Sequence, residues 1–326
     1  MQRAIRALLP KASVPQDGAM PLERLVPATE PARLVRAELI EGRVMRARPI
    51  HGEPKVGFRA FLDGTQSSHV LAYAEGGEGA TTSGISIVHG TVAAVIRVRR
   101  QRRLTTWRRP VVTRRIYAPM ALLSAEWRAV LQQLDLAVVD TSSSEPDASS
   151  PSHPFTLRDE AIHRVQRDRE AAEHELAERW CAAESEPIFV DGGISGSERV
   201  AVSTQTVGVV KSHRTLYADG TALRVILNLR AAERSSVLRV TSPKRTTVAS
   251  WYLRLREWTG HDPMWGLVRV EIAYADHADE ETIGTRADEV SRWILAEVSP
   301  LALPDSRWDK MVYGVRDCEE FLRAIA

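Results

Sequence analysis

The chain has 326 residues, of which 44% are hydrophobic and 26% charged, and its formal net charge is +2. This balance is typical of one large or two ordinary globular domains and excludes a collagen, a coiled coil and a wholly disordered chain. The two cysteines, Cys181 and Cys318, exclude a disulfide framework and a thiolate zinc site built from this chain alone. No run approaches 18 apolar residues, so we expect no transmembrane helix and a location in the cytoplasm.

The first half of the chain predicts strands after an irregular start. Residues 1–55 contain many prolines and are expected to form helical pieces and loops. Apolar and β-branched stretches bounded by glycine then predict strands, at 56–63, 68–74 and 85–99, with 81–115 as two strands that lead into an arginine run. A helix is expected at 120–136, and the Ser/Pro/Asp-rich segment 141–154 is expected to be a surface linker.

The second half begins with a long predicted helix, for which Thr156 is the expected N-cap and Ala183 the expected end. Apolar strands are predicted next, at 188–191, 205–211, 222–229, 236–240, 247–256 and 266–274. Helices are expected at 285–298 and 315–325. This order predicts a mixed α/β fold with a largely antiparallel sheet that is flanked by helices.

Two aspartates follow apolar strands and precede glycine. Asp63 lies in FRAFLDGTQ and Asp191 in PIFVDGGISG. A carboxylate at a strand end, next to a residue without a side chain, can be directed into a cleft. The alternative is a simple turn, because Asp-Gly also ends strands for conformational reasons.

The long helix supplies a third acid. At 100° per residue, its apolar residues form one stripe, and Arg169 and Glu173 lie inside that stripe. A charge on a buried face is costly unless it is paired or binds a metal ion. Either Arg169 and Glu173 form an i,i+4 pair, or Glu173 is a metal ligand with Arg169 beside a phosphate. Glu170 is the substitute for Glu173.

Lys211 ends the predicted strand QTVGVVK and is expected to support a phosphate near the acids, or else to be a solvated strand end. Three carboxylates from two strands and a helix predict a site for Mn²⁺ or Mg²⁺, which prefer oxygen ligands. Two such ions stabilise the attacking and leaving oxygens in phosphodiester hydrolysis. Arg269 and Glu271 share one strand face, and an ordinary ion pair is the alternative for them.

The arginine run lies between Arg97 and Arg115, where nine arginines occur without an acid. Arginine grips phosphate, and tryptophan can stack on a base. We therefore predict nucleic-acid contacts by the run, with a protein or lipid surface as the alternative. The predicted contact residues are Arg99, Arg100, Arg102, Arg103, Trp107, Arg108 and Arg109, together with Arg169 on the helix.

The ordered motifs resemble the NurA nucleases over roughly residues 56–326. The resemblance is carried by FLDG, the Arg/Glu-rich helix, FVDGG, VGVVKSHR, WYLRL and VRVEIA. It implies an RNase H-like core, with Asp63, Glu173 and Asp191 as metal ligands and Lys211 as a catalytic residue. The family's C-terminal Ala-His pair has no counterpart here, and the residues that could serve in its place are Arg307, Lys310 and Tyr313.

The resemblance implies a division into an N-terminal segment (1–55) and a nuclease domain (56–326), with an insert or basic arm at about 75–155. It also implies a metal-dependent deoxyribonuclease that works as a homodimer with a HerA-type hexameric ATPase, in DNA end processing or antiviral defence. The alternatives are a non-catalytic DNA-binding or docking subunit of such a complex, and an enzyme that cleaves RNA or an RNA–DNA hybrid.

Overall fold

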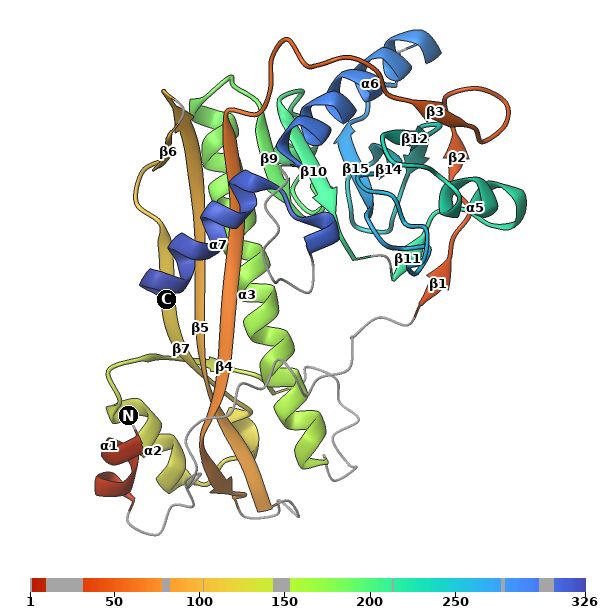
Figure 1. The fold of residues 1–326 in the computed structure, drawn as a ribbon. Coiled ribbons are helices and arrows are strands. Elements are labelled where there is room, and N and C mark those ends of the chain that lie inside the picture. Colours follow the sequence, from red (N-terminus) through yellow and green to blue (C-terminus); the bar gives the residue numbers. More distant parts are fainter. Residues whose placement is uncertain are drawn as a thin grey trace.

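A mixed sheet of 13 strands runs through the molecule and carries helices on both faces (Figure 1). The computed structural model describes residues 2–9, 32–77, 83–101, 103–142, 153–212, 214–276, 279–298 and 308–326. Most of the predicted linker 141–154 lies outside these residues. The predicted α/β class is confirmed, and no helix in the described ranges is long and apolar enough to cross a lipid bilayer.

The centre of the sheet is built from five strands in the order β7-β5-β4-β9-β10. Strands β4 and β9, and β9 and β10, pair in parallel, whereas β4–β5 and β5–β7 are antiparallel. The bounds of these strands are β4 Ala60–Glu75, β5 Ser83–Arg100, β7 Val111–Ala118, β9 Ile188–Asp191 and β10 Thr206–Val210.

Further strands extend the sheet at both edges. On the β10 side the order continues through β15, β14, β13 and β2 in antiparallel pairs, and β12 links β14 to β3. On the other side, β8 pairs with β7 and β6 with β5. The bounds are β2 Glu38–Leu39, β3 Ala47–Pro49, β6 Arg103–Thr106, β8 Ala137–Asp140, β12 Glu233–Ser235, β13 Leu238–Val240, β14 Val248–Arg254 and β15 Leu267–Ala273; β1 (Arg33–Leu34) and β11 (Thr215–Leu216) form a separate pair.

The helices divide between the two faces of the sheet. Helix α3 (Pro154–Ala183) packs its apolar stripe on one face, and α6 (Glu280–Glu297) and α7 (Tyr313–Ile325) cover the other (Figure 1). Helices α1 (Gln2–Leu8) and α2 (Ala125–Gln133) close a third apolar cluster at the far end of β4 and β5. The remaining elements are α4 (Glu198–Ala201), α5 (Gly220–Leu227) and two 3₁₀ turns, Met120–Leu122 and Trp308–Lys310.

Three predictions about local structure are wrong. The predicted strands 56–63 and 68–74 are one strand, β4, because its pairing with β5 continues past Gly64. Residues 222–229 are largely helical, since Leu223 donates to the Asp219 carbonyl and the helix buries Ile226 on one side. Helix α3 is capped by the His153 side chain, two residues ahead of the helical Phe155, and not by Thr156.

The segment before residue 55 contains short strands where helical pieces and loops were expected, and a buried arginine joins it to the main sheet. Arg234 on β12 is 1% exposed. Its guanidinium donates to both oxygens of Glu41, at 2.6 and 2.9 Å, and to Asp288 on α6. Residues 83–118, inside the stretch expected as an insert or basic arm, supply β5, β6 and β7 of the same sheet.

Candidate functional site

Asp63 and Asp191 lie side by side on neighbouring strands. In the parallel pair of β4 and β9, Leu62 is opposite Val190, so the two aspartates are the next residues along each strand. Adjacent strands are about 4.8 Å apart, and residues in matched positions point to the same face. Asp191 ends its strand as predicted, whereas Asp63 is the fourth residue of the long strand β4.

Lys211 directly follows β10 and contacts Asp191. Its Nζ donates to Asp191 Oδ2 at 2.8 Å, and both side chains are largely buried, at 12% and 13% exposed. The parallel pairing of Val209 with Asp191 places the end of β10 beside the end of β9. Lys310 lies next to this point, because its Nζ donates to the Lys211 carbonyl at 3.1 Å.

Glu173 approaches the aspartates from α3. Its side chain is directed inward as the helical stripe predicts, and the residue is 7% exposed. It lies against Gly64, where a Cβ atom would overlap the carboxylate, so the absence of a side chain at 64 makes room for it. Glu173 also forms the alternative i,i+4 pair with Arg169, whose Nε donates to Gln66 Oε1 at 3.1 Å.

The three acids do not share one face of the sheet. Side chains alternate along β4, so Asp63 points to the face covered by α7, while Gly64 opens under α3. The structure therefore joins Asp63 to Asp191 directly and brings Glu173 close from the other face. It also adds an acid that the sequence did not suggest, since Glu319 on α7 raises the pKa of Asp63.

Burial raises the pKa values of two of the three acids. Burial raises the pKa of Asp63 well above its ordinary value, and the charges of Asp191 and Glu173 raise it further, against the effect of Lys211. Burial likewise raises the pKa of Glu173 to about 7, although Arg169 opposes the shift. Both shifts mark carboxylates that are stabilised by binding a proton or a cation.

The chemistry of these donors fits a hard divalent cation better than their present geometry does. Asp63 accepts one hydrogen bond, from the Gly64 N–H at 2.8 Å, and no other in the described part of the chain. Asp191 and Glu173, by contrast, are held by Lys211 and Arg169. Among the described residues, no three His, Cys, Asp or Glu side chains are arranged to hold a metal ion. Asp63 and Asp191 are the residues that would hold one, with Glu173 close by.

The arginine run serves in part as scaffold. Arg99 donates to both oxygens of Glu297 on α6, at 2.6 and 2.7 Å. Trp107 is 7% exposed, donates to Glu184 at 2.9 Å and packs edge-on against Trp180. The prediction that Trp107 stacks on a base is therefore wrong for this structure, because the ring is inside the protein.

The remaining described arginines of the predicted contact set are exposed around the β5–β6 hairpin and the residues after it. They are Arg100, Arg103, Arg108 and Arg109, and Arg102 lies outside the described residues. Arg108 lies over the Trp107 ring, with its guanidinium carbon 4.6 Å from the ring centre. These four side chains keep the capacity to contact a polyanion.

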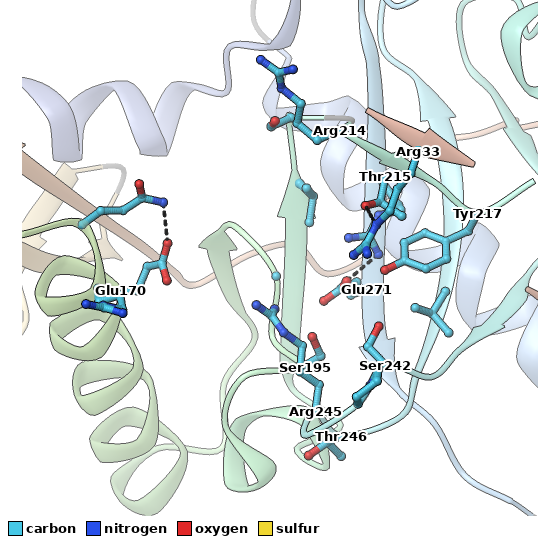
Figure 2. A pocket seen from close by; sticks show the side chains of 18 of the residues that line it. Arg33, Glu170, Ser195, Arg214, Thr215, Tyr217, Ser242, Arg245, Thr246 and Glu271 are labelled. Atoms are coloured by element: carbon cyan, nitrogen blue, oxygen red, sulfur yellow. Dashed lines mark hydrogen bonds and ion pairs between the residues drawn. The ribbon is translucent and has the colours of Figure 1, made fainter. Parts of the chain in front are cut away.

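A second basic region is a cleft of about 710 Å³ between α3 and the loops that follow β9, β10 and β13 (Figure 2). Its walls carry five arginines, Arg33, Arg167, Arg214, Arg245 and Arg269, and two acids, Glu170 and Glu271. The first four arginines were not predicted, because Arg33 and Arg245 are more than two hundred residues apart in the sequence. The local signal closest to them is the basic, hydroxyl-rich turn Ser-Pro-Lys-Arg-Thr-Thr at 242–247.

Two buried groups in the cleft wall neutralise each other. Arg269 donates to Glu271, and Glu271 also accepts the Ile194 N–H at 2.8 Å. The structure thus contains the ordinary ion pair between Arg269 and Glu271 that was the alternative prediction. Glu170, the predicted substitute for Glu173, accepts from Gln166 at 3.0 Å and faces the cleft.

No protein-family model matches the chain, and the comparison with curated proteins finds no match. The geometry of the site and its surroundings therefore carries the functional argument.

Proposed function

We propose that the chain is a NurA-like, metal-dependent deoxyribonuclease that hydrolyses DNA phosphodiester bonds. The observation that carries the proposal is the placement of Asp63 beside Asp191, with Lys211 on Asp191 and Glu173 near them. A buried acid with a raised pKa, such as Asp63, next to a second acid on the neighbouring strand is typical of catalytic sites.

The sheet supports the finer proposal of an RNase H-like core. Three antiparallel strands, β4, β5 and β7, come first in the chain, helix α3 follows, and β9 and β10 then add in parallel on the other side of β4. This arrangement places the first strand at the centre, where Asp63 meets the strand that ends in Asp191. We interpret this five-stranded unit with its helix as the RNase H-like part of the fold.

Each side chain has a proposed role. Asp63 and Asp191 would hold Mn²⁺ or Mg²⁺, with Glu173 as a further carboxylate, and the bound ion would supply an activated water and stabilise charge on the phosphate. Lys211 now contacts Asp191, and a cation at this carboxylate would compete with the ammonium group and leave it available to a phosphate oxygen. Arg169 is placed to do the same beside Glu173. A homodimer and a HerA-type ATPase are the proposed partners.

The test is cleavage of labelled single-stranded DNA, duplex DNA and an RNA–DNA hybrid with Mn²⁺ or Mg²⁺, with and without a HerA-type translocase. We expect cleavage that stops with a chelator and is lost in Asp191→Asn. The matched control is Asp135→Asn, since Asp135 is exposed and away from the site. Cleavage by Asp191→Asn at the wild-type rate contradicts the proposal, and the preferred substrate decides between DNA and hybrid.

One observation favours a second candidate, a non-catalytic DNA-binding or docking subunit. Asp191 and Glu173 are already paired with Lys211 and Arg169, so the structure balances two of the three acids without a metal ion. This candidate predicts salt-sensitive DNA binding without any metal-dependent cleavage. Chelator-sensitive hydrolysis by the purified protein rejects it.

A further inference from the structure

We infer that the cleft between α3 and the loops after β9, β10 and β13 binds the phosphate backbone of a single nucleic-acid strand and leads it past the ends of β9 and β10 toward Glu173. This inference deepens the proposed function, on which it rests, by naming the path and the form of the substrate. Nothing in the sequence patterns pointed to this cleft, since its cations come from distant parts of the chain.

The charge of the cleft is unbalanced. Arg269 is neutralised by Glu271, and Glu170 is held by Gln166 and lies 3.8 Å from Arg169. Three other arginines of the lining are exposed and form no ion pair or side-chain hydrogen bond with any described residue, and the Arg33 guanidinium donates to the Thr215 hydroxyl. Those three are Arg167, Arg214 and Arg245. Unpaired guanidinium groups on three walls of a hollow attract phosphate.

Hydroxyl groups add hydrogen-bond donors between the arginines. The lining includes Ser195, Ser212, Thr215, Ser242 and Thr246, which come from four separate loops and strands (Figure 2). Serine and threonine hydroxyls are common contacts to phosphate oxygens, and they position a strand without reading its sequence. The lining therefore favours a sugar–phosphate chain over an acidic peptide of the same charge.

The cleft adjoins the proposed catalytic residues at three points along the chain. Gly193 lies two residues after Asp191, and Ser212 directly follows Lys211. Glu170 lies one helical turn before Glu173 on α3. A strand held in the cleft would therefore pass the ends of β9 and β10 on the α3 side of the sheet, where Glu173 approaches Gly64.

The shape favours a single strand. The cations line the inside of a hollow, and a positively charged groove that follows one backbone is the usual means of binding single strands. Duplex DNA is read in contrast by elements that project into its grooves. Binding of a strand in the cleft is expected to be independent of base sequence, because the contacts are to phosphate.

The experiment measures the anisotropy of a labelled oligothymidylate of about 16 nucleotides, in chelator so that no strand is cut. The test variant is Arg214→Gln/Arg245→Gln. The control, Arg128→Gln/Arg230→Gln, removes the same charge at exposed arginines outside the cleft. We expect the test variant to lose about tenfold or more in affinity, and its slope of log affinity against log salt to fall by about 1.4, at ~0.7 per contact. The control should stay within about twofold.

Three outcomes overturn the inference. They are equal affinity of test and control variants, tighter binding of a duplex of the same length, and displacement by polyglutamate as effective as by unlabelled oligothymidylate. The two proposals fail separately. If strand binding depends on the cleft but no metal-dependent cleavage occurs, the inference about the cleft holds and the proposed nuclease activity is contradicted. Metal-dependent cleavage, with unchanged strand binding and turnover in the cleft variant, supports the nuclease and contradicts the inference about the cleft.

Discussion

The molecule has two arginine-rich regions that differ in how their charges are used. The run between Arg97 and Arg115 is dense in the sequence, yet several of its members pair with acids of distant helices: Arg97 with Asp317, Arg99 with Glu297 and Arg115 with Asp168. The cleft arginines are scattered in the sequence and meet in space, and four of the five have no acid partner in the described parts of the chain. Charge density along the chain is therefore a poor guide to where a polyanion binds.

The carboxylates extend this contrast. The half-buried arginines of the run, Arg97, Arg99 and Arg115, each pair with a carboxylate, whereas burial raises the pKa values of Asp63 and Glu173. Balanced charge favours scaffold and unbalanced charge favours a site. Substitutions at the carboxylates and at the buried members of the run should therefore have different effects on cleavage, strand binding and stability.

The largest expected effect is on cleavage. Asp63→Asn should lower the rate of metal-dependent cleavage by about a thousandfold, equivalent to about 4 kcal/mol in the barrier, because it removes a ligand next to Asp191. Folding should survive, since the amide resembles the protonated acid that burial already favours. Single-turnover cleavage and thermal unfolding check this, again with Asp135→Asn as control. Full activity in Asp63→Asn would remove this acid from the mechanism.

Trp107→Leu should lower the free energy of unfolding by about 3 kcal/mol, since it leaves a cavity against Trp180 and removes the bond to Glu184. Oligothymidylate affinity should stay within about twofold, whereas loss of a base-stacking ring would cost ~1–3 kcal/mol of binding. Urea unfolding and anisotropy measure the two quantities. The exposed aromatic Tyr73, changed to leucine, is the control. If the Trp107→Leu protein is stable but binds the oligonucleotide weakly, Trp107 contacts the nucleic acid and the scaffold role is wrong.

The carboxylate cluster should make stability fall as pH rises. Glu173 has a folded-state pKa of about 7 against an ordinary value of 4.5, so the folded protein binds more protons than the unfolded chain between these values. Its contribution to stability is present below about pH 4.5 and is lost as pH passes 7, by up to about 3 kcal/mol. Glu173→Gln should lack this loss, and Glu53→Gln, at an exposed position, should retain it. Parallel pH profiles of wild type and Glu173→Gln would contradict the raised pKa.

The smallest expected effect concerns the scaffold role of the run. Arg99→Gln should lower the free energy of unfolding by about 2 kcal/mol, since it leaves the mostly buried carboxylate of Glu297 unpaired. The neighbouring Arg100 is exposed, and Arg100→Gln should stay within about 0.5 kcal/mol. Strand affinity in chelator should be the same for both variants. A stable Arg99→Gln protein that binds DNA weakly would make Arg99 a contact residue and undo the comparison.

Local pattern was sufficient for several parts of the site. The apolar run that ends in Asp191, the glycine at φ 139° that follows it and the inward stripe of α3 with Glu173 are all visible in short windows of sequence. These features depend on backbone preference and on the 100° turn per residue. For the same reason the α/β class and the inward orientation of Glu173 were correctly predicted.

Local pattern failed where a distant partner decides the structure. Asp63 lies within β4, because the pairing partner β5 continues past the Asp-Gly that suggested a strand end. Trp107 is buried because it packs against Trp180 and donates a hydrogen bond to Glu184, which lie more than seventy residues away in the sequence. Neither partner can be read from the sequence around the residue.

The sequence by itself determined which residues carry charge, where most strands and helices form and which side of each one is apolar. The tertiary structure decided which charges are neutralised and which remain available, because ion pairing requires groups to meet within a few ångströms, whatever their separation in the chain. That distinction separates the arginines of the scaffold from those of the cleft.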